Sequence, residues 1–571
     1  MSFKSWCELI ITIFLLAWGA NFLFIKVIIN NKRDLSDIAL NEQSNITSVR
    51  KKNETALYRN FLVPIGFPLT TGLGLSLGYK IRNGNFMDVW KAIMDVTIEK
   101  NNYIKFNNRK KYTLSQINGA ANHIIKEVYE KYDVNEVGVN ISVSSFEGFV
   151  ISIASMIHSI RNSEGKGLMH YLTSVPRQRL SKVDVLVIDS WQSFRMLNKS
   201  EEWYKLIIVC DNNENVLKPK DSKTLKNVKT WSEIIRNYTE EPKFEYDPPT
   251  DNADELKLLL NITTSSNETT SFNQLNLVSS ISAFIKTFPL DNELSSRDII
   301  TEICDPFSLT KKNLQVWSKV LSVLLHGGSA QFILDKEIDL DAINDTTLLI
   351  ANPKALSDIA KTIKDKYPSS SLFSSINQSF STTLLSEGIM NKLSKLNVPQ
   401  LQRLRSIYLA EELINETHIL SFDGKIPKRT KGQIKEKFTT TKLNYFRSLF
   451  GCRLVVELYC PYIIMGPISQ TNFYDYRIFP KVVDENVTCV GSMTTTLEGK
   501  IVQTEENSEL DIENRQGMLC VRGFTIGRPV TEKRLQDAST MSTNIAGGEG
   551  WIPLVGVFGL WGQDGCLYIY N

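Results

Sequence analysis

DVLVID (184–189) and KLIIVCD (205–211) are two short, uninterrupted apolar runs that are rich in β-branched residues. Such runs are typical of strands that are buried on both faces of a mainly parallel sheet. A strand-like segment, EVGVNISV (136–143), precedes them, and the helix-like segment FEGFVISIASMIHSI (146–160) follows it directly. This alternation predicts an α/β fold with open sheets that are covered by helices.

The chain is long enough for several subdomains. It has 571 residues and a mass of 64.8 kDa, which exceeds the size at which a single hydrophobic core usually stops growing. Strand-like runs become denser after residue 453, as in LVVELY (454–459) and CLYIYN (566–571), and predict a smaller β-rich subdomain. The expected parts are a membrane anchor (1–30), a linker (31–83), α/β subdomains (84–450) and the β-rich end of the large domain (451–571).

Composition and charge argue against two classes of function. The formal net charge of +3 indicates no concentrated basic surface, so no nucleic-acid partner is expected. The eight cysteines and five histidines include no CxxC pair and no HExxH motif, so we expect no metal site. Acid–base catalysis by histidine has no support in the sequence.

The amino-terminal stretch WCELIITIFLLAWGANFLFIKVII (6–29) is almost wholly apolar. A helix of about 20 residues can cross a bilayer core of about 30 Å, so the stretch predicts a membrane helix and makes membrane lipid an expected partner. Lys4 alone precedes it, whereas Lys32 and Arg33 follow it. Because positive charge stays on the cytosolic side, we expect the bulk of the chain in the cytosol, at the endoplasmic reticulum membrane.

Two further features bear on this topology. Asn-X-Ser/Thr sequons, which would suit a luminal glycoprotein, occur at Asn45, Asn53, Asn198, Asn237, Asn261, Asn267, Asn344, Asn377, Asn415 and Asn486. We give the charge rule precedence, because a chain rich in Asn, Ser and Thr contains many sequons by chance. A second apolar stretch, FLVPIGFPLTTGLGLSLGY (61–79), holds prolines and glycines that disfavour a spanning helix. It is either a membrane-associated segment or a linker that packs on the globular part.

Segments spread over residues 100–571 follow a familiar order. They include YTLSQINGAANHI (112–124), FGCRLVVELY (450–459), GMLCVRGF (517–524) and GWIPLVGVFGLWGQDGCLYIY (550–570). Together they resemble the adenylate-forming superfamily, and within it the fatty acyl-CoA synthetases and fatty-acid transport proteins. The resemblance implies a large domain of stacked open sheets with helices and a small β-rich subdomain. It also implies carboxylate activation, in which a fatty acid attacks the α-phosphate of ATP and CoA then displaces AMP.

In that family a loop with glycines and a lysine holds the phosphates, and the resemblance puts this loop at ITTSSNETTSFNQ (262–274). The segment contains no glycine and no lysine, and Glu268 adds a negative charge that should repel phosphate. Its hydroxyl groups remain, at Thr263, Thr264, Ser265, Ser266, Thr269, Thr270 and Ser271. We interpret these as degenerate nucleotide-loop positions, and an ordinary polar surface loop is the alternative.

Three more features of the family are missing. Its YGaTE motif ends in a glutamate that holds Mg²⁺, whereas this chain has Tyr462 and Ile463 at the last two positions. Val557 stands where the family has an aspartate for the ribose hydroxyls. An alkyl side chain can neither ligate Mg²⁺ nor accept a hydrogen bond. The chain also stops at Asn571, before the C-terminal domain in which the family carries a catalytic lysine.

These losses predict a protein without catalytic residues, cofactor or metal. We expect a catalytically inactive, membrane-anchored relative of the acyl-CoA synthetases, with a binding or scaffolding role in lipid metabolism. A fatty acid, an acyl-CoA or a partner membrane protein would be its partner besides lipid. Two alternatives stay open: an active but divergent fatty acyl-CoA synthetase or transporter that uses hydroxyl groups, and a purely structural membrane assembly protein. Nucleotide binding would identify the first alternative, and a bound lipid would exclude the second.

Overall fold

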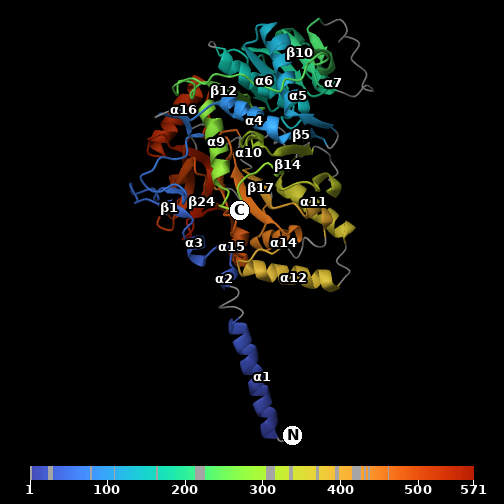
Figure 1. Ribbon diagram of the computed structural model, residues 1–571. Coiled ribbons are helices and arrows are strands. Elements are labelled where there is room, and N and C mark those ends of the chain that lie inside the picture. Colours follow the sequence, from blue (N-terminus) through green and yellow to red (C-terminus); the bar gives the residue numbers. More distant parts are fainter. Residues whose placement is uncertain are drawn as a thin grey trace.

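Two large sheets and the helices around them form the globular part of the chain, and helix α1 (Phe3–Leu23) projects away from it (Figure 1). The fold comes from a computed structural model. It describes residues 3–23, 30–77, 80–107, 110–162, 165–211, 226–303, 315–333, 339–367, 372–391, 398–413, 426–429, 432–434, 437–460 and 462–571. This arrangement confirms the predicted α/β fold.

The smaller of the two sheets is mainly parallel. Its described strands lie in the order β11 (Val228–Thr230), β10 (Leu206–Val209), β9 (Val183–Ile188), β7 (Glu136–Asn140), β8 (Leu168–Leu172), β12 (Leu258–Thr263), β13 (Thr269–Asn273) and β23 (Arg528–Pro529). The runs predicted as buried strands at 184–189 and 205–211 are β9 and β10, which pair in parallel. All four residues of β10 are buried, as a strand covered on both faces requires.

The larger sheet is mixed and runs through most of the remaining chain. Its described strands lie in the order β1 (Ser44–Ile46), β2 (Tyr58–Asn60), β21 (Leu497–Val502), β22 (Gln516–Gly523), β24 (Ile552–Trp561), β25 (Leu567–Tyr570), β20 (Val487–Met493), β19 (Pro467–Gln470), β18 (Arg453–Tyr459), β17 (Ser406–Glu412), β16 (Leu348–Ala351), β14 (Ile299–Ile303), β15 (Ser329–Ile333), β5 (Tyr103–Phe106) and β6 (Lys110–Thr113). The parallel strand β18 joins the antiparallel end of the sheet to β17, so the sheet is continuous across residue 451. A separate ribbon pairs β3 (Leu75–Leu77) with β4 (Lys80–Arg82).

Helices cover these sheets, and capping side chains define where several of them begin. The longer ones are α4 (Phe86–Lys100), α5 (Leu114–Ile124), α6 (Phe146–Arg161), α9 (Gln274–Lys286), α10 (Gln315–Leu325), α11 (Pro353–Lys366), α12 (Leu372–Ser386), α14 (Thr440–Phe450) and α16 (Glu532–Asn544). The short ones are α2 (Asn30–Lys32), α3 (Asp37–Asn41), α7 (Trp191–Arg195), α8 (Trp231–Ile234) and α15 (Lys481–Asn486). Asn85, Thr113 and Asn273 form capping boxes at α4, α5 and α9, which satisfy amide groups that the first helical turn leaves unpaired.

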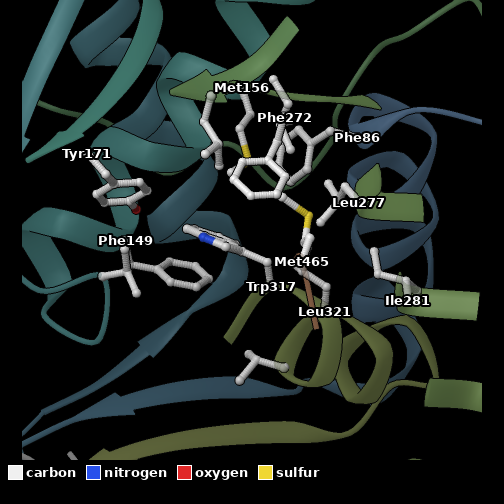
Figure 2. Packing of buried hydrophobic residues seen from close by; sticks show 14 of the residues in the cluster. Phe86, Phe149, Met156, Tyr171, Phe272, Leu277, Ile281, Trp317, Leu321 and Met465 are labelled. Carbon is white, nitrogen blue, oxygen red and sulfur yellow. The ribbon is translucent and has the colours of Figure 1, made fainter. Parts of the chain in front are cut away.

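The main hydrophobic core lies where the helices between the two sheets meet. Figure 2 shows side chains from α6, α9, α10 and β13 filling this interior, among them Phe149, Leu277, Trp317 and Phe272. The Trp317 and Phe149 rings stack with their centroids 5.6 Å apart, and Met465 closes the same cluster. Burial of such large apolar side chains, at about 25 cal/mol per Å², holds the two sheets in one unit.

The membrane helix predicted over residues 6–29 is not supported. Helix α1 ends at Leu23, and residues 24–29 lie outside the described part of the chain. Among the described residues, no helix combines the length and the apolar character needed to cross a bilayer. In the second apolar stretch, 61–79, the described residues form turns and strand β3 rather than a long helix.

Candidate functional site

The predicted phosphate loop is a closed β-hairpin. Strands β12 and β13 pair antiparallel, with Thr263 opposite Thr269. The turn between them is held by Thr264 N, which donates to Glu268 O at 3.0 Å, and by Glu268 N, which donates to Thr264 Oγ1 at 3.3 Å. Asn267 takes a positive φ of 61°, which asparagine tolerates. With the bond from Asn267 N to Thr264 O at 3.0 Å, three backbone donors of the turn are therefore engaged within it and are not presented to an anion.

The hydroxyl groups of the hairpin mostly bond to one another. Thr263 Oγ1 lies 2.7 Å from Thr269 Oγ1, and Ser271 Oγ donates to Asn261 Oδ1 at 2.6 Å. Thr264 Oγ1 lies 2.8 Å from Ser266 Oγ at the exposed turn. Among the other predicted positions, Thr270 is buried opposite Pro529 of β23 and Ser265 is exposed. The structure thus brings Thr263 and Thr269 together and leaves the turn residues apart from them.

The carboxylate in this segment has an internal partner. Glu268 forms an ion pair with Arg534 of α16, a helix more than 200 residues later in the chain. Burial lowers the pKa of the Arg534 guanidinium, and Glu268 opposes that shift. The counter-charge of this carboxylate therefore lies on α16, and the ion pair joins the hairpin to that helix.

A row of buried polar side chains crosses four neighbouring strands, β7, β8, β12 and β13. The Glu136 carboxylate of β7 accepts a hydrogen bond from His170 Nδ1 at 3.0 Å, and His170 Nε2 contacts Thr263 Oγ1. Thr263 then reaches Thr269, so a continuous path of hydrogen bonds runs from β7 to β13. We call these four residues the histidine row. A hydroxyl that contacts an imidazole oriented by a carboxylate is an arrangement that can move a proton.

His170 and Glu136 were not predicted from the sequence. The partners of His170 lie 34 and 93 residues away from it in the chain, so no local motif contains them. The strand pairing brings them together, because Gly138, His170 and Asn261 lie side by side on β7, β8 and β12. A signal existed only in the rarity of a histidine within an otherwise apolar strand.

A cavity of about 670 Å³ opens beside the hairpin. Thr263, Thr264 and Asn267 line one side of it, and Leu172, Arg177 and Met196 belong to the rest of its lining. The lining therefore combines apolar surface, hydroxyl groups and one guanidinium. Its volume lies within the range of small-molecule sites in proteins.

The predicted metal and ribose positions are part of the hydrophobic core. Tyr462, Ile463 and Val557 are all buried and belong to the same core cluster. Ile463 O accepts from Gly527 N at 2.7 Å, so its backbone is used in the fold as well. In the described part of the chain, no three His, Cys, Asp or Glu side chains gather as a metal site would require.

A second buried polar cluster lies at the centre of the molecule. Lys319 of α10 contacts the Glu457 carboxylate, and its Nζ donates to Tyr459 Oη at 2.5 Å. We call these three residues the lysine cluster. The Lys319 ammonium also lies 5.0 Å from the centre of the Tyr408 ring and 5.8 Å from that of Phe284, within cation–π range.

Burial decides the electrostatics of the lysine cluster. It lowers the pKa of Lys319, which Glu457 opposes, and raises the pKa of Tyr459 well above its usual value. The cavity next to Lys319 has a volume of only about 10 Å³, which is room for about one water molecule. The interior between α9 and α10 is therefore filled by the protein's own side chains.

Solved structures with this arrangement are adenylate-forming enzymes. The luciferase-like enzyme of the mealworm Zophobas morio matches with a TM-score of 0.53 and 12% identity, over 88% of this chain and 98% of that one. The N-terminal domain of FACL13 from Mycobacterium tuberculosis matches with a TM-score of 0.50 and 11% identity, over 86% of this chain and all of that one. The anthranilate CoA ligase AuaEII matches with a TM-score of 0.53 and 11% identity, over 85% and 76%. At these identities the match shows the fold, and activity has to be argued from the site.

Comparison of sequences finds a relative that matches this chain over its full length. No model of a known protein family matches the chain. An uncharacterized protein of Saccharomyces cerevisiae, YHR045W, is 50% identical over 572 residues, which cover all of both chains. The chain has the fold of the adenylate-forming enzymes. Because the relative is 50% identical over the full length of both chains, the chain belongs to the family of YHR045W.

Proposed function

We propose that this protein is a membrane-attached binding protein with an adenylate-forming fold that does not activate carboxylates. The observation that carries the proposal is the closed hairpin at 262–274. The amides of Thr264, Asn267 and Glu268 bond within the turn, and the Glu268 carboxylate is paired with Arg534. A triphosphate needs free N–H donors and positive charge at such a loop. The hairpin offers a carboxylate in their place.

Nucleotide binding tests this proposal directly. Thermal unfolding of the full chain should be unchanged by millimolar Mg-ATP, and ATP–pyrophosphate exchange with fatty acids should be absent. Binding to the native state would raise the free energy of unfolding by about 2.7 kcal/mol at 100 times the dissociation constant. An active acyl-CoA synthetase, treated in parallel, is the positive control. A Mg²⁺-dependent shift would contradict the proposal.

The ligand that we propose is a fatty acid or an acyl-CoA, held in the cavity beside the hairpin. The cavity supports this choice because Leu172 and Met196 suit an apolar chain, whereas Arg177 suits an anionic head. Native mass spectrometry of the purified chain should show bound lipid, and Arg177→Ala should weaken it. A chain without bound lipid, and without affinity for added palmitate or palmitoyl-CoA, would favour a structural assembly role.

Membrane attachment through α1 is part of the proposal. The described side chains of α1 from Leu9 onward are almost all exposed and apolar on every side of the helix, including Phe14, Leu16 and Trp18. A helix that is apolar all round needs an apolar environment. The globular part, in Figure 1, does not supply one. We propose the endoplasmic reticulum membrane as the location.

Two sequon residues support a cytosolic orientation. Asn261 is buried within β12, and the Asn45 amide donates to the carbonyl oxygens of Phe61 at 2.9 Å and Val63 at 3.0 Å. A glycan on either side chain would remove these contacts. Treatment with endoglycosidase H should leave the electrophoretic mobility of the protein unchanged, and a shift would reverse the proposed orientation.

The histidine row favours a second candidate function, an enzyme that uses the Thr263 hydroxyl. The Thr263 proton would pass to His170 while its oxygen attacks an acyl thioester in the cavity, and the thiol would leave with that proton. Thiol release from palmitoyl-CoA tests this candidate. Release that is lost in Thr263→Val and His170→Asn, but kept in Ser266→Ala, would establish the enzyme. The absence of release from the unaltered chain would exclude it.

A further inference from the structure

Helix α12 is a surface helix without a charged residue. Its sequence is LFSSINQSFSTTLLS. Ile376 and Phe380 are 61% and 47% exposed, and a spacing of four residues puts them on one face of the helix. Ser381 and Leu385, on the opposite side, are buried. The outer face of a helix in water usually carries charged side chains, so this face suits a different environment.

Two further exposed apolar side chains belong to elements that Figure 1 places at the same end of the globular part as α12. Ile38 of α3 is 72% exposed, and Val482 of α15 is 69% exposed. We call Ile38, Ile376, Phe380 and Val482 the apolar end face. Helices α12 and α15 are both bonded to α14. Ser448 of α14 donates to the Gln378 carbonyl of α12 at 3.3 Å, and Thr440 of α14 donates to the Asp484 carboxylate of α15 at 2.8 Å.

The chain that follows α1 is fastened to this same end. Asp34 N donates to Gly388 O at 3.0 Å, and Arg33 forms an ion pair with Glu387 at 3.6 Å, directly after α12. Tyr476 Oη donates to the Asp34 carboxylate at 2.8 Å. Figure 1 accordingly shows α2, α3 and α12 at the end of the globular part from which α1 leaves.

We propose that the apolar end face rests on the surface of a phospholipid bilayer, with Ile376 and Phe380 in the boundary between headgroups and acyl chains. The inference rests on the proposed attachment through α1 and adds a second contact to it. A bilayer that holds α1 lies next to α12, because residues 33 and 34 are fixed at the end of that helix. Bulky apolar side chains among uncharged hydroxyl residues suit this boundary.

Photo-crosslinking in the full chain tests the contact. The photoreactive residue p-benzoylphenylalanine replaces Phe380, which it resembles in shape, and the chain is reconstituted with vesicles of phosphatidylcholine and phosphatidylserine. A matched variant carries the same residue at Leu256, which is 73% exposed and precedes β12, far from α1 in Figure 1. Vesicle flotation is recorded for both variants, and equal melting temperatures show that both fold.

The outcomes separate this inference from the proposed attachment. If both variants float and only the one altered at position 380 gives a lipid adduct, the inference is supported. If the variants float but position 380 gives no lipid adduct, or gives an adduct to protein, the proposed contact between the apolar end face and the bilayer is overturned. The proposed attachment through α1 is then unaffected. If neither variant floats, the proposed attachment fails and the contact fails with it.

Discussion

The lysine cluster and the histidine row, two of the buried polar clusters of this protein, differ in what lies beside them. The lysine cluster is enclosed by aromatic rings and borders a cavity of about 10 Å³, whereas the histidine row borders one of about 670 Å³. Both contain a carboxylate and a basic side chain. Only the histidine row has room for a ligand next to it. The comparison shows that access, and not the presence of ionisable groups, separates a structural cluster from a possible site.

The largest effect should come from breaking the lysine cluster. Glu457→Leu leaves the Lys319 ammonium buried without its counter-charge, so the free energy of unfolding should fall by about 3–5 kcal/mol. The double variant Lys319→Met/Glu457→Leu should recover most of that loss, because an apolar pair of similar volume needs no compensation. Urea unfolding measures both. A double variant as unstable as the single one would mean that the cluster is not a simple charge pair.

Breaking the histidine row should cost less. His170→Ala leaves Glu136 and Thr263 without their shared partner, and the free energy of unfolding should fall by about 1–3 kcal/mol. Thr263→Val removes only one hydroxyl, so its loss in the free energy of unfolding should lie at the lower end of that range. If both variants were as stable as the unaltered chain, water from the neighbouring cavity would be replacing the lost bonds. The row would then be more open to solvent than its burial indicates.

A pH series compares these clusters with a single buried tyrosine, Tyr204. Burial raises the pKa of Tyr204 to about 12, and among the described residues its hydroxyl has no hydrogen-bond partner. The unfolded chain loses this proton near pH 10 and the folded chain near pH 12, so stability is lost as pH rises through this window. Relative to Tyr204→Phe, the unaltered chain should lose up to about 2 kcal/mol. Parallel curves for the two proteins would contradict this assignment.

The smallest effect is expected at the hairpin turn. The Glu268–Arg534 pair is partly exposed, so Glu268→Gln should change the free energy of unfolding by less than about 1 kcal/mol. It should not create ATP binding, because the amides of Thr264, Asn267 and Glu268 stay engaged within the hairpin. Isothermal titration with Mg-ATP checks this point. Measurable affinity in the variant would show that a single carboxylate had been excluding the nucleotide.

Local patterns predicted the elements of the fold well. The apolar runs at 184–189 and 205–211 are strands, and the helix-like segment at 146–160 is α6, because strand and helix periodicity are properties of neighbouring residues. The predicted membrane helix was not supported, since no helix among the described residues is long and apolar enough to cross a bilayer.

The candidate site was far less predictable. The resemblance located Thr263, but the groups that contact it could not be found from sequence. Lys319 and Glu457 lie 138 residues apart, and His170 lies 93 residues from Thr263. Such pairs can be identified only when strand order and register are known. Neither follows from the composition of a strand. Tyr462 and Ile463 were predicted as lost metal positions, and the structure adds that both pack into the core.

The pairing of β2 with β21 has a consequence for synthesis. Arg59 of β2 meets Glu498 of β21 across 439 residues of chain. A ribosome that adds about 5–20 residues per second takes about 20–90 s to supply that partner after β2 has been made. Throughout this interval the ribbon of β1 and β2 has an unpaired edge, the kind of surface on which nascent chains aggregate. The edge of β2 is therefore covered only late in synthesis, once β21 has been made.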